Sequence, residues 1–278
     1  MGTAEEIRTV LDGRWEEVRQ EVRSRLDPET FAPPVSTLPL DEHRQRTLEA
    51  VLELTQTDFA RNGLTEEQGG TNEHGASVTA FEMLGHADLS VFVKAGVQFG
   101  LFGGAIANLG TKRHWDAYLP GMLDGSLLGS FAMTELGHGS DVQSLLTTAT
   151  YVPETDEIEI HSPGIAARKD YIGGAGKHAR WASVFAQLIT AGPGEEPTGR
   201  GVHCFVVPIR DDKGEDLPGV TTSDCHYKGG LPGVDNGTFS FDQVRIPREA
   251  LLNKFADLDS DGTYHSDIAN ENARFFTM

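Results

Sequence analysis

The chain has 278 residues, 38% of them apolar, which is enough for one large or two ordinary domains with a real core. It carries 23 Lys and Arg against 42 Asp and Glu, a formal charge of -19, so its field repels nucleic acid and anionic membrane surfaces. Two cysteines cannot form a disulfide framework and the charged N-terminus has no apolar leader, so we expect a reducing, cytoplasmic setting.

Helix signals fill the first 125 residues of the chain. Apolar side chains recur at spacings of three and four, with turn residues between the segments. Helices are predicted over 3–26, 41–61, 76–85, 88–110 and 111–126, with a proline-rich loop at 27–39. The apolar segment 88–110 contains Lys94, Gln98 and several glycines, which indicates a buried helix rather than a membrane span, with Gly110 as its C-cap.

From about residue 128 the hydrophobic period changes to two. Residues 146–152 and 157–161 predict a hairpin. Further strands are expected at 181–190, 201–210, 219–227 and 237–246. A helical block followed by a strand block predicts an α+β fold or two domains. Phe275 and Phe276 indicate a helix that is just starting, with nothing after it to bury them.

Hydrolase and metal patterns do not fit this sequence. The segment TELGHGSD (134–141) is not a nucleophile elbow, because Ser140 follows Gly139 directly. The pairs His203-Cys204 and Cys225-His226 lie on predicted strands, where neighbours face opposite ways, so we expect a buried cysteine beside an outward histidine. The calcium-like DLDSDG (257–262) has Ile268 at position twelve of the loop, where glutamate is needed, so we expect an acidic turn and no metal site.

The glycine cluster YIGGAGKHA (171–179) leaves two interpretations open. Gly174, Gly176 and Ala179 satisfy G-x-G-x-x-A, but a strand rather than a helix is predicted next, so the dinucleotide motif lacks its context. The phosphate-binding loop fails as well, since His178 follows Lys177. The cluster is either a simple tight turn or backbone that lies flat against a planar ligand or an anion.

TELGHGSD itself suits a cofactor loop. Thr134 follows an apolar run and precedes a glycine-rich turn. A hydroxyl and several backbone N–H groups in such a turn offer donors to a planar heterocycle with carbonyl and ring-nitrogen acceptors.

Several segments, taken in order, resemble the acyl-CoA oxidases, which belong to the flavin-dependent acyl-CoA dehydrogenase superfamily. The resemblance runs from about residue 64 to 265 and is carried by LFGGAIANLGTKRHWDAYLPGMLDGSLLGSFAMTELGHGSD, TTATYVPETDEIEIHSP, YIGGAGKHARWASVFAQLI, GVHCFVVPIRD and DNGTFSFDQVRIPREALL. It implies an N-terminal α-helical domain (1–127), a β-barrel-like middle domain (128–255) and, at 256–278, the start of a C-terminal four-helix bundle that is absent.

The resemblance also implies roles for single residues. Thr134 and Gly173 match positions that contact FAD, with Met133, Gly139 and Ser140 beside them in the loop. Ser140, together with His138, matches the side of the loop near the acyl-CoA. Asp170 and Tyr171 depart from the family, which carries tryptophans there, so less aromatic packing against the flavin is expected.

The implied reaction is FAD-dependent α,β-dehydrogenation of an acyl-CoA to the trans-2-enoyl-CoA, with electrons passed to oxygen to form hydrogen peroxide. The family's base is a glutamate in the bundle, beyond Met278, so no catalytic residue is assigned and the chain is expected to be inactive alone. Glu135 is a poor substitute, because on an extended segment it faces away from Thr134.

Three alternatives remain at this point: a non-catalytic subunit of a hetero-oligomeric acyl-CoA dehydrogenase, a dehydrogenase that uses an electron-transfer flavoprotein, and a plain hydrolase. The expected partners are an acyl-CoA and further subunits in a homo- or hetero-oligomer, with no nucleic acid and no membrane.

Overall fold

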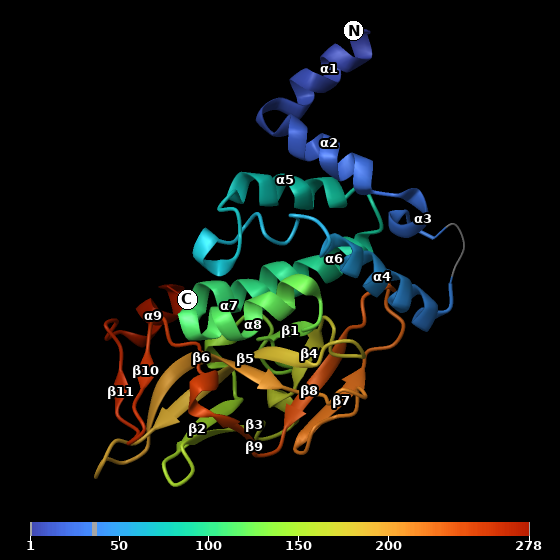
Figure 1. Cartoon of the computed structure of the whole chain (residues 1–278). Helices are drawn as coiled ribbons and strands as arrows, with labels where there is room; N and C mark the ends of the chain where they lie inside the picture. Colours follow the sequence, from blue (N-terminus) through green and yellow to red (C-terminus); the bar gives the residue numbers. More distant parts are fainter. Residues whose placement is uncertain (1, 35–37, 278) are drawn as a thin grey trace. The chain divides into compact units, whose positions relative to one another are not determined.

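The computed structural model describes residues 2–34 and 38–277. Its contacts divide the chain into two compact units (Figure 1). The first unit comprises Met1–Gly96, Leu123–Gly125 and Tyr227–Val234, and the second comprises Val97–Met122, Ser126–His226 and Asp235–Met278. Residues 35–37 of the predicted proline-rich loop lie outside the described part of the chain.

The first unit is built from helices. They are α1 (Thr3–Asp12), α2 (Glu16–Arg25), α3 (Pro28–Phe31), α4 (Leu40–Leu54), α5 (His74–Leu84) and α6 (Leu89–Ala95). The single helix predicted over 3–26 is wrong, because the chain breaks at Gly13, whose φ of +57° lies in the left-handed region. The helix predicted over 41–61 ends early, at Leu54, where the hydroxyls of Thr55 and Thr57 bond nearby carbonyls and compete with the helical pattern.

The predicted apolar helix over 88–110 is confirmed as a helical stretch with an unexpected centre. It consists of α6, a π-helical segment (Gly96–Phe102) and α7 (Gly103–Leu109), with Gly110 at the C-cap. By length and composition Leu89–Leu109 could cross a membrane, but 61% of its most apolar window is buried inside the protein, and core helices pass the same test. The last helix of this half, α8 (Lys112–Asp124), follows the prediction for 111–126.

The described residues of the second unit form three sheets. The largest holds β1 (Gly129–Ala132), β5 (Trp181–Thr190), β2 (Thr148–Val152), β3 (Glu157–His161) and β9 (Val244–Pro247) in that order, with β6 (Thr198–Pro208) also paired to β5. The others are β4–β8–β7 (Lys169–Ile172, Gly237–Phe241, Val220–Asp224) and β10–β11 (Asp257–Leu258, Tyr264–His265). The α+β prediction is therefore confirmed, as a helical N-terminal part followed by a curled sheet.

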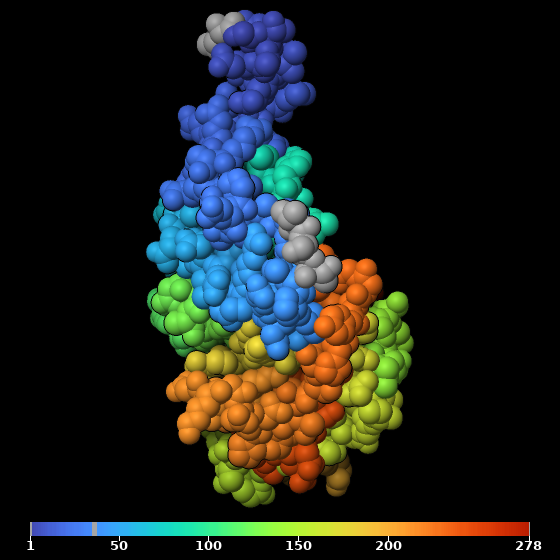
Figure 2. All heavy atoms as spheres, turned by 90° about the vertical axis from the view of Figure 1, so that its right-hand side faces the viewer, coloured from blue at the N-terminus to red at the C-terminus, as the bar shows by residue number. Residues whose placement is uncertain are grey.

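The hairpin prediction is confirmed by the antiparallel pairing of β2 with β3. The strand predicted over 237–246 is instead two strands in different sheets, β8 and β9, because the chain turns at Gln243 with a φ of +53°. Ser162, just after β3, donates its backbone N–H to Phe241 O of β8, so the two sheets meet there. The space-filling view shows yellow-green and orange segments, which are far apart in sequence, side by side at the surface of this unit (Figure 2).

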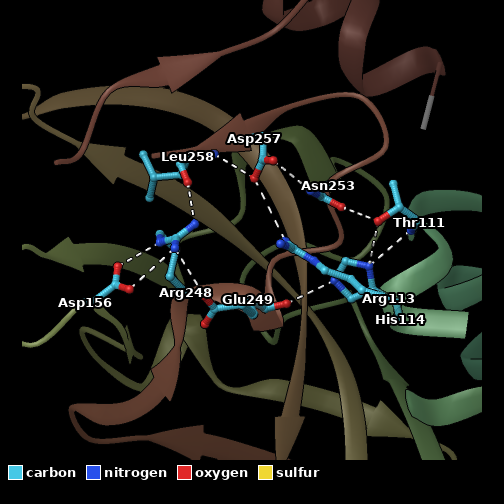
Figure 3. A network of polar contacts seen from close by, with 9 residues as sticks. All are labelled: Thr111, Arg113, His114, Asp156, Arg248, Glu249, Asn253, Asp257 and Leu258. Atoms are coloured by element: carbon cyan, nitrogen blue, oxygen red, sulfur yellow. Dashed lines mark hydrogen bonds and ion pairs between the residues drawn. The ribbon is translucent and has the colours of Figure 1, made fainter. Parts of the chain in front are cut away.

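The segment after β9 is fixed to α8 by a polar network (Figure 3). His114, only 1% exposed, accepts the backbone N–H of Thr111 at Nδ1 and donates Nε2–H to Glu249 O over 3.0 Å. Thr111 Oγ1 donates to Asn253 Oδ1 at 2.7 Å. Burial lowers the pKa of His114, so the imidazole is neutral in this donor and acceptor arrangement.

Two side-chain predictions need correction. His203 does not face solvent, because Tyr264 covers it and its Nε2 lies 3.0 Å from the Tyr264 hydroxyl, leaving His203 2% exposed. The final helix, α9 (Glu271–Thr277), begins where predicted, but only Phe276 is strongly exposed, at 80%. Phe275 is half-buried and lines a pocket.

Candidate functional site: a loop at an interrupted sheet edge

The TELGHGSD loop leaves the sheet where one edge of β5 lacks a strand. β1 runs parallel to β5 and its last pair is Ala132 with Val184, whereas β2 pairs with the same strand only from Gln187 onward. The other edge of β5 is occupied by β6 along its length. Residues 133–147 therefore start and finish at neighbouring points of β5, and the loop is anchored at both ends.

A buried ion pair fills the gap between β1 and β2. Lys169, the first residue of β4, places its Nζ 3.0 Å from Glu135 Oε1, 2.7 Å from Phe185 O and 3.1 Å from Met133 O. Both side chains are fully shielded from solvent. Glu135 also accepts the backbone N–H groups of Leu146 and Thr147 and the hydroxyl of Thr147.

In this pair, each charge opposes the effect that burial has on the pKa of the other group. Burial lowers the pKa of Lys169 to about 8, although the Glu135 carboxylate acts in the opposite direction. Burial alone would raise the pKa of Glu135, but the Lys169 charge and the hydrogen bonds from Leu146 and Thr147 lower it. Glu135 thus points into the interior, and its carboxylate is already engaged.

Thr134 lies on the opposite side of the loop from Glu135 and is half-buried. Its Oγ1 donates to Asp170 O at 3.1 Å, and the Asp170 N–H donates to Thr134 O over the same distance. Loop and β4 are therefore paired through backbone as well as through the ion pair. The structure brings Thr134 next to the strand that leads into Gly173.

The glycine turn after β4 is held by two buried charged residues. Asp235 Oδ2 accepts the backbone N–H groups of Lys177 and His178 at 3.1 and 2.8 Å. Arg210 donates to the carbonyls of Ala175 and Ala179. The cluster is thus an ordered turn rather than a dinucleotide-binding helix start, since β5 follows it.

Gly173 and Gly174 have separate reasons to be glycine. A Cβ on Gly173 would lie 2.8 Å from Val97 Cγ2, so the residue permits close approach of the π-helical segment. Gly174 has a φ of +83°, which favours glycine. Ser130 Oγ donates to Gly173 O at 2.8 Å and so ties β1 to the turn.

An apolar pocket of 330 Å³ opens beside the loop. Met133, Phe131 and Phe185 line it from the sheet, and Leu101, Leu109 and Phe275 line it from the helices. Asn108 also lines this pocket, but its amide donates to Gly104 O. The pocket therefore offers an apolar surface directly adjoining the residue before Thr134.

The remaining predicted residues lie on the exposed end of the loop. His138 is half-buried and closes a turn through backbone bonds in both directions with Glu135. Gly139 and Ser140 are exposed, and nothing stands within 4 Å of a Cβ built on Gly139. Near Thr134, Asp170 Oδ2 lies 3.4 Å from Arg168, which offsets its charge, while Tyr171 is 65% exposed with a φ of +58°.

Reasoning from the sequence missed the residues that hold these two turns: Lys169, Asp235 and Arg210. Each is charged and buried. Lys169 stands between Arg168 and Asp170, which gives no local signal of burial, and its partners lie 16 to 36 positions away. Within the described residues no cluster of three or more His, Cys, Asp or Glu side chains could hold a metal ion.

Comparison with known proteins matches both halves of the chain to one superfamily. Residues 14–126 match the acyl-CoA dehydrogenase N-terminal domain and residues 130–244 match the middle domain. Acyl-coenzyme A oxidase 2, peroxisomal, from Arabidopsis thaliana is 50% identical over 198 residues, which is 70% of this chain and 28% of that protein. The chain thus spans under a third of that relative's length.

Solved structures agree with this result. Acyl-CoA oxidase 1 from Yarrowia lipolytica superposes with a TM-score of 0.80 at 29% identity, covering 95% of this chain and 37% of that one. Acyl-CoA oxidase-2 from Caenorhabditis elegans, solved with FAD, ascaroside-CoA and ATP, gives a TM-score of 0.76 at 26% identity over 96% of this chain and 39% of that one. The chain belongs to the acyl-CoA dehydrogenase and oxidase superfamily, whose N-terminal and middle domains it carries.

Proposed function

We propose that this chain holds FAD at the loop Met133–Ser140 and serves as the flavin-binding part of an acyl-CoA oxidase. One observation carries the proposal: the half-buried Thr134, held just after β1 by two hydrogen bonds with Asp170, directly follows Met133, which lines an apolar pocket. Membership of the superfamily supports the same choice of cofactor.

The residues present fit a planar, acceptor-rich ring. Thr134 has a hydroxyl that can turn from Asp170 O toward a ligand acceptor, and the open space over Gly139 leaves its backbone accessible. Gly173, half-buried just after β4, adds only backbone to this neighbourhood, since the space its side chain would take is filled by Val97. FAD, when bound, supplies the electron acceptor for the dehydrogenation, and the protein residues bind and orient the cofactor and the substrate.

The apolar pocket is suited to the acyl chain of the substrate. Its aliphatic and aromatic lining from Leu101, Met133 and Phe275 favours a hydrocarbon tail over a charged group. The reaction would convert the acyl-CoA to its trans-2-enoyl-CoA, with oxygen as the final acceptor. The substrate, oxygen as acceptor and assembly into a homo- or hetero-oligomer are all part of the proposal.

We expect the isolated chain to turn over slowly or not at all. Among the described residues that line the pocket none has a carboxylate, and Glu135 is buried in its ion pair. A general base must lie within hydrogen-bonding distance of the α-proton, and neither the pocket-lining residues nor Glu135 provide such a base. The cytoplasmic setting predicted from the sequence differs from the peroxisomal setting in the name of the Arabidopsis relative.

The test is a titration of the purified 278-residue chain with FAD, followed by absorbance and by quenching of flavin fluorescence. Saturable binding with one FAD per chain is expected, and it should weaken in Thr134→Val. Absence of binding would contradict the proposal and favour an assembly subunit. Acyl-CoA-dependent peroxide release, measured on the same sample, should be near background, and reduction of a supplied electron-transfer flavoprotein instead of oxygen would point to a dehydrogenase.

A further inference from the structure

We infer that Lys169 and Glu135 are positioning residues for the cofactor loop: the buried pair replaces the missing strand at the edge of β5 and so sets where the Thr134 hydroxyl points. This inference deepens the proposed function and rests on it for its cofactor part. Its loop-ordering part stands on the geometry of this chain alone.

The position of Lys169 in the sheet gives the first argument. β1 pairs with β5 as far as Val184, and β2 pairs from Gln187. Phe185 lies between these stretches, and its carbonyl accepts Lys169 Nζ at 2.7 Å. Because a buried backbone carbonyl needs a partner, the ammonium group does there what the N–H of a continuous strand does elsewhere.

The second argument is that the same ammonium group also binds the loop. Lys169 Nζ donates to Met133 O, the carbonyl immediately before Thr134. Because the peptide group between Met133 and Thr134 is planar, holding the Met133 carbonyl also holds the orientation of the N–Cα bond of Thr134. One cation therefore links the sheet edge to the residue that carries the proposed cofactor contact.

Glu135 extends this link to the far end of the loop. Its carboxylate receives Lys169 on one side and the N–H groups of Leu146 and Thr147 on the other. Thr147 O in turn accepts the backbone N–H of Gln187 at the start of the β2 pairing. Both ends of the 133–147 loop are thus connected through two side chains that lie wholly inside the protein.

Three variants separate positioning from general stability. Lys169→Met and Glu135→Gln each remove one charge and leave the other buried without its counter-ion, whereas the double variant removes both charges. Stability should fall in each single variant and recover in part in the double variant. The order of the loop should not recover in the double variant, because methionine cannot donate a hydrogen bond to Met133 O or Phe185 O.

Arg248→Met provides the matched control. Arg248 also bonds a carboxylate, that of Asp156, and a backbone carbonyl, that of Leu258, and the hydrogen bonds of its side chain go to Asp156, Leu258 and Glu249, none of them in the loop. It sits in the same unit, in the network of Figure 3. All variants are compared at temperatures where their far-ultraviolet circular dichroism shows the same folded fraction.

The first readout is amide hydrogen exchange without cofactor. Exchange at residues 133–137 and 145–147 should rise in Lys169→Met and remain raised in the double variant, with β5 and β6 unchanged, while Arg248→Met leaves the loop as in the parent chain. Equal loop protection in the parent and in Lys169→Met would overturn the inference, whatever the result with FAD.

The second readout is the Kd for FAD. We expect it to rise by about tenfold or more in Lys169→Met and in the double variant, and to stay within about twofold of the parent in Arg248→Met. Recovery of affinity in step with stability in the double variant would show an ordinary structural role and overturn the inference. If the parent chain binds no FAD, the proposed function and the cofactor part fail together, and the exchange experiment still decides the loop part.

Discussion

The two turns that flank Thr134 and Gly173 are both held by buried charges, but in different ways. In the loop after β1, the cation and the carboxylate bond each other as well as the backbone, with Lys169 Nζ 3.0 Å from Glu135 Oε1. In the glycine turn, Asp235 accepts backbone N–H groups and Arg210 donates to backbone carbonyls. The first turn depends on a fully buried Lys–Glu pair, whereas in the second Asp235 and Arg210 bind different backbone groups and the His178 ring, with Nδ1 3.4 Å from Asp235 Oδ1, faces the carboxylate as a possible cation.

This difference determines how each turn should respond to damage. Removing one member of a bonded pair leaves an uncompensated ion inside the protein, which is more destabilising than removing a hydrogen-bond acceptor from a backbone turn. The loop after β1 should therefore be the more fragile of the two, and its variants the more strongly coupled.

The largest effect is expected from Lys169→Met. The free energy of unfolding should fall by about 3 to 5 kcal/mol, because Glu135 remains buried without its counter-ion. Urea denaturation followed by circular dichroism measures the change. A loss below about 1 kcal/mol would mean that the two turns do not differ in the way proposed.

Acid offers a way to weaken the unit through a residue outside both turns, His203. Burial lowers the pKa of His203 from 6.5 to about 4, so the unfolded chain binds this proton first as pH falls. The stabilisation is complete above pH 6.5 and is lost progressively as pH falls toward 4, by at most about 3 kcal/mol.

This acid effect is checked by measuring the free energy of unfolding between pH 7 and pH 4. In His203→Gln the free energy of unfolding should change less with pH over this range than in the parent chain. An unchanged slope would assign the acid sensitivity to other groups, with His114, whose pKa is also lowered, as the next candidate.

A smaller loss is expected for Asp235→Ala. The backbone N–H groups of Lys177 and His178 lose this charged acceptor, which should lower stability by about 2 kcal/mol and raise hydrogen exchange in residues 174–179. Asp242→Ala, at a carboxylate 85% exposed, serves as the control and should change little. A loss as large as that of Lys169→Met would remove the contrast between the turns.

The smallest effects come from the glycines. Gly174→Ala forces a side chain into the left-handed region and should lower stability by about 1 kcal/mol. Gly139→Ala, where a Cβ meets open space, should stay within about 0.5 kcal/mol. Thermal unfolding of both variants tests this, and an equal loss in the two would contradict the assigned backbone geometry.

Much of the fold could be predicted from local patterns. The hairpin of β2 and β3 matches the structure because alternation of apolar and polar residues is a property of the segments themselves. The strand at 181–190 matches because it is an apolar run bounded by turn residues. The breaks at Gly13 and Gln243 could not be predicted, because tertiary contacts decide which residue of a periodic run adopts a positive φ.

The candidate site was predictable to a lesser degree. Thr134 was a candidate because of its neighbours in sequence, whereas the buried ion pair of Glu135 with Lys169 was not predicted. The contact between Thr134 and Asp170 joins residues 36 positions apart, and the burial of Lys169 depends on three separate segments. No local pattern contains such information.

The interrupted edge of β5 also bears on how this architecture can diversify. Because β1 and β2 pair with separate stretches of β5, residues could be inserted or deleted between 138 and 143 without shifting the register of either strand. New side chains can then arise at residues 138–143 while the pairings of β1 and β2 with β5 remain intact. Selection for binding specificity and selection for a stable fold can therefore act on almost separate sets of residues.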